Sequence, residues 1–60
     1  MDVKQLRAKY EGKLVFVRIS DPYHPIAAQG RVESVDDAGQ LHGTWGGLAA
    51  IPGIDDIELL

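Results

Sequence analysis

The stretch VDDAGQLHGTW, residues 35–45 of a chain of 60, carries the clearest structural signal in the sequence. It places the window DDAG between two segments of strand character, VESV before it and QLHGTW after it. An aspartate at the start and a glycine at the end of such a window are typical of a type I turn or of a short hairpin loop built on one. We expect Gly39 in the left-handed region, with Asp36 or Asp37 accepting hydrogen bonds from the amides of the turn. The stretch therefore predicts a central β-hairpin.

Segments typical of strands lie on both sides of this hairpin. The strand after the turn alternates, with Leu41, Gly43 and Trp45 on one face. Residues 30–36 form the strand before it, and KLVFVRIS, residues 13–20, is an earlier strand rich in β-branched and aromatic residues. Because apolar residues of both parities occur in the earlier strand, we expect a bend or bulge at which its buried face changes.

The segment between the first two strands, SDPYHPIAAQG, has a different character. Pro22 and Pro25 lack a backbone donor, so neither can join a ladder of hydrogen bonds in the middle of a sheet. We predict that this segment is a loop or an irregular arm.

The two ends of the chain complete the pattern. Residues 2–10 predict a short helix, capped by Asp2, that ends at Gly12 and buries one side if it packs on a core. The pair Gly46-Gly47 predicts a tight second hairpin, followed by a strand at LAAI. After Pro52-Gly53 we expect one 3-10 turn and a last short strand.

The order of these elements resembles the SH3-like barrels. We therefore expect a small all-β protein, a five-stranded SH3-like antiparallel barrel with a short N-terminal helix and one 3-10 turn before the last strand. A single domain would span residues 1–60, with residues 1–11 as an N-terminal helical segment and residues 12–60 as the barrel.

Three segments carry a narrower resemblance: KYEGKLVFVRISDPY (residues 9–23), GRVESVDDAGQLHGTW (residues 30–45) and LAAIPGIDDIELL (residues 48–60). On these segments the chain resembles a family of short bacterial and phage proteins classed only as a domain of unknown function. That family usually has an apolar residue where this chain has Gly43, and an acidic residue followed by glycine where it has Gly46-Gly47. The resemblance implies an origin in phages, plasmids or conjugative elements, and it supplies no catalytic residue.

The residue types that carry chemistry are sparse. The chain has no cysteine, which excludes disulfides, thiolate metal sites and cysteine nucleophiles. Asp36, Asp37 and His42 could in principle hold a metal ion, but zinc would need further ligands and a calcium loop needs alternating oxygen donors. The serines lack a nucleophile elbow and an oxyanion-hole motif beside them. We therefore predict no enzyme activity, no catalytic residue, no metal site and no cofactor.

Charge is distributed unevenly along the chain. Residues 1–31 hold all six bases and three acids, and residues 32–60 hold six acids and no base, giving −3 overall. Antiparallel pairing could bring the halves together and offset their charges, or the surface could be bipolar and orient a partner. We favour the first interpretation.

The arm is the best candidate for a contact surface. DPYHPI places an aromatic residue and a histidine between two prolines, where the backbone is constrained. Trp45 could lie with one ring face toward this arm, or it could fill a very small core together with Phe16. The expected contact residues are those of the arm, the tryptophan and two flanking charges: Asp21, Tyr23, His24, Trp45, Arg18 and Arg31.

From these features we predict a small cytoplasmic, non-enzymatic module that binds a partner protein and does not bind a membrane. One alternative is association with nucleic acid through the basic N-terminal half, although phosphate contacts need a basic face. A second is an acidic inhibitor of a host or defence protein. Pairing of the last strand, IELL, with a second copy would give a homodimer.

Overall fold

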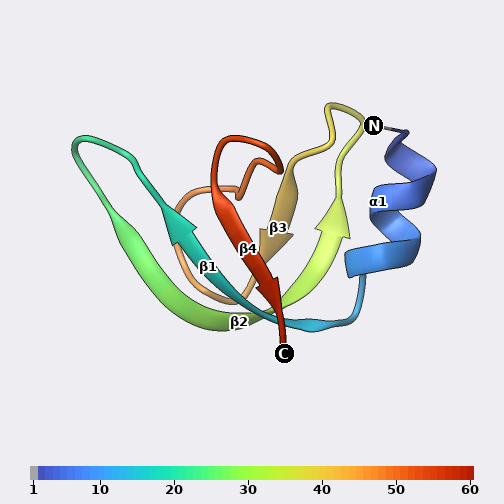
Figure 1. Ribbon diagram of the computed structural model, residues 1–60, viewed down its shortest axis with the longest axis horizontal. Helices are drawn as coiled ribbons and strands as arrows, with labels where there is room; N and C mark the ends of the chain where they lie inside the picture. Colours follow the sequence, from blue (N-terminus) through green and yellow to red (C-terminus); the bar gives the residue numbers. More distant parts are fainter. Residues whose placement is uncertain (1) are drawn as a thin grey trace.

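The structure is a computed structural model that describes residues 2–60. One helix and four strands follow along these residues in the order α1 (Val3–Tyr10), β1 (Leu14–Ile19), β2 (Ile26–Val35), β3 (Leu41–Gly43) and β4 (Asp56–Leu59). The strands form an open antiparallel sheet in the order β3-β2-β1-β4. Figure 1 shows the sheet curving strongly along β2, with α1 at one end and the loop between β1 and β2 projecting at the other.

One face of β1 is buried along its whole length, because Val15, Val17 and Ile19 point inward and the residues between them do not. The predicted change of face within residues 13–20 is therefore wrong. The irregularity lies in β2, whose register with β3 shifts between Val32 and Ser34. This bulge turns β2 by one residue, so that its later inward positions still face the core. The core consists of these residues: Leu6, Tyr10, Val15, Val17, Ile19, Val32, Val35, Leu41, Trp45 and Ala50.

The predicted helix is confirmed at both ends. Asp2 is the N-cap, and its side chain accepts a hydrogen bond from Lys4 N at 3.2 Å. Leu6 and Tyr10 bury the same side of α1 in the core. The chain leaves the helix through Gly12 at a φ of 77°, which glycine adopts without strain.

The predicted central hairpin is also confirmed. Asp36 Oδ1 accepts hydrogen bonds from Ala38 N at 3.0 Å and from Gln40 N at 2.9 Å. Gly39 has a φ of 82°, as the turn requires. Arg7 ties α1 to this turn, since Arg7 Nη2 lies 3.0 Å from Asp37 Oδ1. At this contact a base of the first half of the chain meets an acid of the second half.

The prediction of five strands in a closed barrel is wrong, because LAAI does not form a strand. Only Ala50 pairs, through two hydrogen bonds with Leu41. On one side of Ala50 the carbonyl of Leu48 accepts a hydrogen bond from Trp45 Nε1 at 2.8 Å, and on the other side Pro52 has no N–H to donate to a ladder. The sheet stays open, with β4 at one edge.

Two smaller predictions also need correction. The arm is shorter than expected, because β2 begins at Ile26, directly opposite Ile19, once the second proline is past. The 3-10 turn before the last strand is a hydrogen-bonded turn, not a helical one. Ile51 O accepts from Ile54 N at 3.1 Å and from Asp55 N at 2.8 Å. Gly53, at a φ of 88°, prevents helical geometry.

The described residues contain no helix that is both long and apolar enough to cross a membrane.

Candidate functional site

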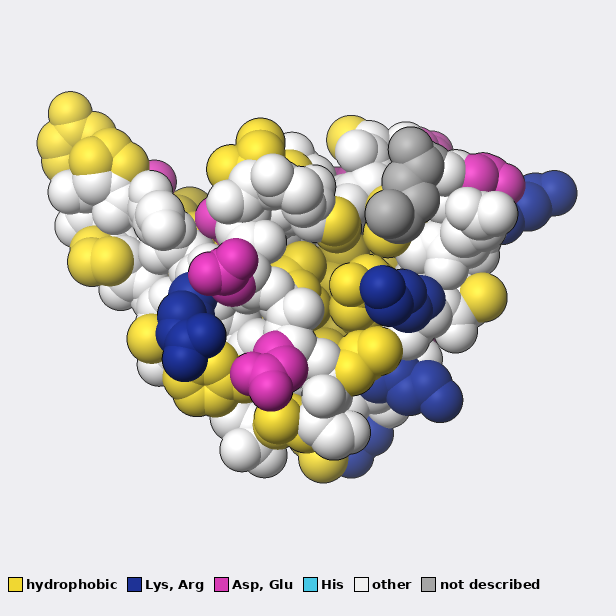
Figure 2. Space-filling model, in the orientation of Figure 1, with side chains coloured by type: hydrophobic (Ala, Val, Ile, Leu, Met, Phe, Trp, Pro, Cys, Tyr) yellow, Lys and Arg dark blue, Asp and Glu magenta, His cyan; other side chains and the backbone are white. Residues whose placement is uncertain are grey.

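The arm, residues 20–25, is held in shape by its own aspartate. Asp21 Oδ1 accepts hydrogen bonds from Tyr23 N and from His24 N, each at 2.8 Å. This closes a tight local turn over residues 21–24, which contains the first proline and is followed by the second. Tyr23 lies on that turn with 84% of its surface exposed, and Figure 2 shows hydrophobic side chains at the end of the projecting arm. The sequence thus presents an aromatic ring on a braced loop.

The two hydrogen bonds that hold the arm depend on the charge of the Asp21 carboxylate. The backbone N–H of His24, and then that of Tyr23, lowers the pKa of the Asp21 carboxyl below its ordinary value. The carboxylate is therefore ionised at neutral pH, when it is the stronger acceptor for both amides.

A hollow of about 340 Å³ lies at the base of the arm. Residues 19–22 border it on one side, and residues of the segment 48–55 border it on the other. Two of its apolar side chains are well exposed, Leu48 at 38% and Ile54 at 76%. An apolar hollow beside an exposed tyrosine and a carboxylate is suited to an apolar side chain and a polar group of a protein ligand.

Trp45 does not face the arm. It is 9% exposed and belongs to the core, as the alternative interpretation of its role predicts. Its indole lies against the backbones of Gly30 and Gly43, where any Cβ would meet the ring. Trp45 is linked to the hollow only through the hydrogen bond from its Nε1 to the carbonyl of Leu48, a residue that borders the hollow.

The two predicted flanking charges lie apart from each other. Arg18 is exposed on the outer face of β1, and its guanidinium carbon lies 5.0 Å from the centroid of the Phe16 ring. Phe16 is only half-buried there, so its predicted place in the core is wrong. Arg31 lies at the other end of the β1–β2 ladder, opposite Leu14, and its Nη1 donates to Gly12 O at 2.7 Å. Arg18 is thus near the arm, and Arg31 is not.

The sequence interpretation missed Leu48 and Ile54. The exposure of Ile54 could have been predicted from its position directly after Pro52-Gly53, because a residue in a tight turn has few neighbours to cover it. Leu48 was assigned to a strand at LAAI that does not form, and its side chain is 38% exposed.

Asp36 and His42, the pair that resembles metal ligands, form a structural contact. Asp36 Oδ2 lies 2.8 Å from His42 Nε2. The His42 side chain, and then the amides of Gln40 and Ala38, lowers the pKa of the Asp36 carboxyl. Within the described residues no group of three or more potential ligands could hold a metal ion.

The chain matches one known family over its whole length. The family model, described as "Domain of unknown function (DUF4314)", covers residues 1–60. Neither the comparison with curated proteins nor that with solved structures found a match.

Proposed function

The chain belongs to DUF4314, a family of domains of unknown function, and we propose for it the role of a small non-enzymatic module that binds a partner protein. The proposed site is the arm together with the hollow at its base. A cytoplasmic location and an origin in a phage or other mobile element are part of the proposal, and the mobile-element origin rests on the sequence resemblance alone.

The exposure of Tyr23 carries the proposal. A free tyrosine ring at 84% exposure is costly to leave in water, yet here it stands on a turn that two hydrogen bonds to Asp21 hold rigid. Aromatic anchors on constrained loops lose little conformational entropy when they bind, and they are enriched at protein interfaces. The adjacent hollow, with Ile54 and Leu48 at its rim, extends the apolar contact area.

Association with nucleic acid is the second candidate. Arg31 lies beside Gly12 and Lys13 near the end of α1. Three basic residues of this region, Lys9, Lys13 and Arg31, could together meet a phosphate backbone. Against it, Arg7 is paired with Asp37. Arg18 also lies at the opposite end of the β1–β2 ladder from Arg31, so the six bases do not form one face, and protein binding is favoured.

A peptide selection tests the proposal. Random peptides displayed on phage are selected on the immobilised wild-type protein, and the enriched peptides are then measured against purified variants. We expect Tyr23→Ser and Ile54→Ser each to weaken binding about tenfold, as for anchors worth more than 1 kcal/mol. Phe16→Ser is the matched control, because Phe16 is an apolar residue on the outer face and does not border the hollow.

The outcome separates the two candidates. If the selected peptides bind Tyr23→Ser and Ile54→Ser as tightly as wild type, the proposed surface is wrong. Binding of mixed RNA or DNA that weakens steeply between low and moderate salt would favour the nucleic-acid candidate instead.

A further inference from the structure

The free edge of β4 is a second surface, apart from the arm, that could bind a partner. β4 pairs with β1 on one side only and ends the sheet. The opposite edge strand, β3, is covered at Leu41, which exchanges hydrogen bonds of 2.8 and 2.9 Å with Ala50. In the part of the chain that the structure describes, β4 is thus the edge strand to which no other segment pairs on its outer side.

The register shows which groups this edge presents. Leu60 N donates to Leu14 O at 3.1 Å, and hydrogen-bonded pairs alternate along an antiparallel ladder. Glu58 therefore occupies a bonded position toward β1, opposite Phe16. The backbone N–H and C=O groups of Ile57 and Leu59 point the other way, toward the free edge.

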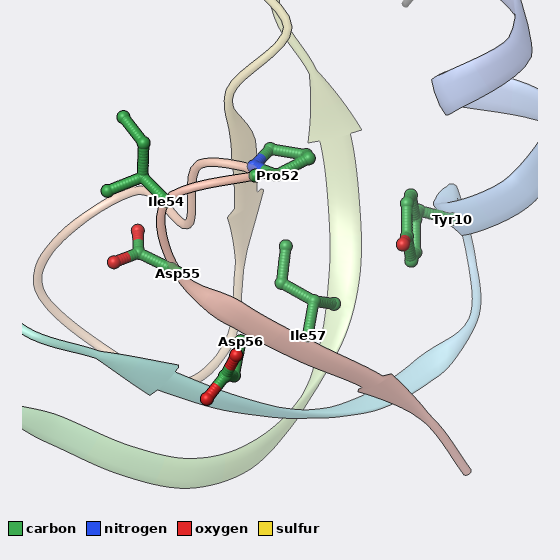
Figure 3. Close-up of a pocket in the computed structure, with 7 residues that line it drawn as sticks. Tyr10, Pro52, Ile54, Asp55, Asp56 and Ile57 are labelled. Atoms are coloured by element: carbon green, nitrogen blue, oxygen red, sulfur yellow. The ribbon is translucent and has the colours of Figure 1, made fainter.

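A groove runs beside this edge. A hollow of about 340 Å³ lies between Tyr10 and the segment 52–57, and a second of about 260 Å³ continues from Pro52 along α1. Figure 3 shows the side chain of Ile57 and the ring of Tyr10 on either side of the first hollow, with Asp56 pointing away from Tyr10. Ile57 and Tyr10 thus give the inner side of the free edge an apolar part, which is bordered by Gly53 and Asp55.

The outer side is acidic. Asp56 and Glu58 are exposed, and Figure 2 shows acidic side chains over β4 with a basic side chain beside them. The ion pairs found among the described residues involve neither of them. Arg18, the residue opposite Asp56 on β1, lies over the Phe16 ring. Neither carboxylate forms an ion pair with Arg18 across the ladder, and both are exposed to a further cationic group.

We propose that the free edge of β4 binds an extended segment of a partner protein that alternates basic and apolar residues. Added as a strand, the segment would bond to the backbone of Ile57 and Leu59. Its apolar side chains would enter the hollow beside Tyr10, and its basic side chains would lie opposite Asp56 and Glu58. The hollow of this site shares Ile54 and Asp55 with the hollow at the base of the arm, but the backbone groups of Ile57 and Leu59 belong to this site alone, and the proposal does not depend on the function proposed for the arm.

Charge argues against a second copy as the occupant. If β4 paired with β4 of another copy in antiparallel fashion, Glu58 would lie opposite Asp56 or Glu58 of the other chain in the two registers that pair Ile57 with Ile57 or with Leu59. Like charges directly opposite each other destabilise a strand pair. A basic strand meets the same edge with complementary charge.

An NMR titration tests the proposal on the full chain. The probe is a short synthetic peptide of alternating lysine and valine, added to the isotope-labelled protein. Peptides of alternating glutamate and valine, and of lysine and valine in blocks, serve as controls. We expect amide shifts centred on Ile57 and Leu59 with the alternating basic peptide, and markedly weaker binding of both controls.

Two variants and one control separate the contribution of the backbone to binding from that of charge. Leu59→Pro removes an N–H that faces the free edge and leaves the β1 ladder intact, so binding should weaken about fivefold or more. Leu59→Val retains the N–H and is the matched control. Asp56→Asn with Glu58→Gln should weaken binding about two- to tenfold without touching the backbone.

Several results would overturn the proposal. These are shifts centred on another surface, equal binding of the block peptide, no binding at millimolar peptide, or unchanged affinity in the paired Asp56→Asn, Glu58→Gln variant. Sedimentation that shows a dimer abolished by Leu59→Pro would mean that a second copy occupies the edge.

Discussion

Replacing Gly43 by alanine is expected to displace the indole of Trp45. A Cβ on Gly43 would overlap Trp45 Cζ3 and the carbonyl oxygen of Arg31, and it would lie 2.7 Å from Trp45 Cη2. Cβ atoms essentially never make contacts under 3.0 Å, so the ring or the backbone of β2 must move. Because one of the overlapping groups is backbone, a change of rotamer alone cannot relieve the contact.

The expected cost follows from two contributions. Overpacking of a core costs about 1–3 kcal/mol. A displaced indole would also lose the hydrogen bond from Trp45 Nε1 to Leu48 O, which contributes about 0.5–1.5 kcal/mol. We therefore expect Gly43→Ala to lower the free energy of unfolding by about 2–4 kcal/mol, and Tm by about 10 °C or more for a domain of this size.

Urea denaturation followed by circular dichroism and tryptophan fluorescence measures this effect. Gly30→Ala is the graded comparison, because its Cβ would lie 2.9 Å from Trp45 N and 3.1 Å from Trp45 Cε3 and should cost less. In the Trp45→Phe background, which lacks Cζ3 and Cη2, Gly43→Ala should cost less than in wild type. A Gly43→Ala variant within about 0.5 kcal/mol of wild type, with unchanged emission, would refute this view of the Trp45 site.

Three further outcomes are expected. The pKa of Asp21 lies below its ordinary value, so the two hydrogen bonds that hold the arm should be complete above about pH 4 and lost as pH falls through the lower folded-state pKa. The Tyr23 and His24 amide signals should shift together in this range. Independent shifts of these two amides would contradict the prediction. Asp36→Ala should lower the midpoint of urea denaturation, because two turn amides lose their acceptor, and an unchanged midpoint would show that these bonds do not stabilise the hairpin. Leu41→Ala, at a residue with no exposed surface, should cost about 2–5 kcal/mol by the same assay, and a loss under 1 kcal/mol would place Leu41 outside the core.

The elements that the sequence predicted well depend on local chemistry. The cap at Asp2, the exit at Gly12 and the turn from Asp36 to Gly39 each follow from a side chain acting on the backbone a few residues away. Such interactions need no knowledge of the rest of the fold.

The wrong predictions of secondary structure concern segments whose conformation depends on contacts with distant parts of the chain. LAAI has the composition of a strand, but the carbonyl of Leu48 accepts a hydrogen bond from Trp45 Nε1, and only Ala50 of this segment pairs with a strand. The bulge was expected in β1 and lies in β2, because its position depends on the partner strand β3. No pattern within a single segment reveals such a partner.

The candidate site was predicted in part. The prolines and aspartate indicated the arm, and the structure places Asp21, Tyr23 and His24 together on it. Trp45 was placed among the contact residues because of its type, but its surface is buried between two glycines. The residues across the hollow come from a segment about thirty positions later, which sequence spacing alone cannot bring to the arm.

A map of amide chemical-shift changes for the tightest selected peptide would show whether the arm and its hollow form the binding surface. We expect the largest changes at Tyr23, Leu48 and Ile54, at moderate salt and with little dependence on it. Changes centred instead on Lys9 and Arg31, and lost as salt rises, would contradict protein binding through the arm.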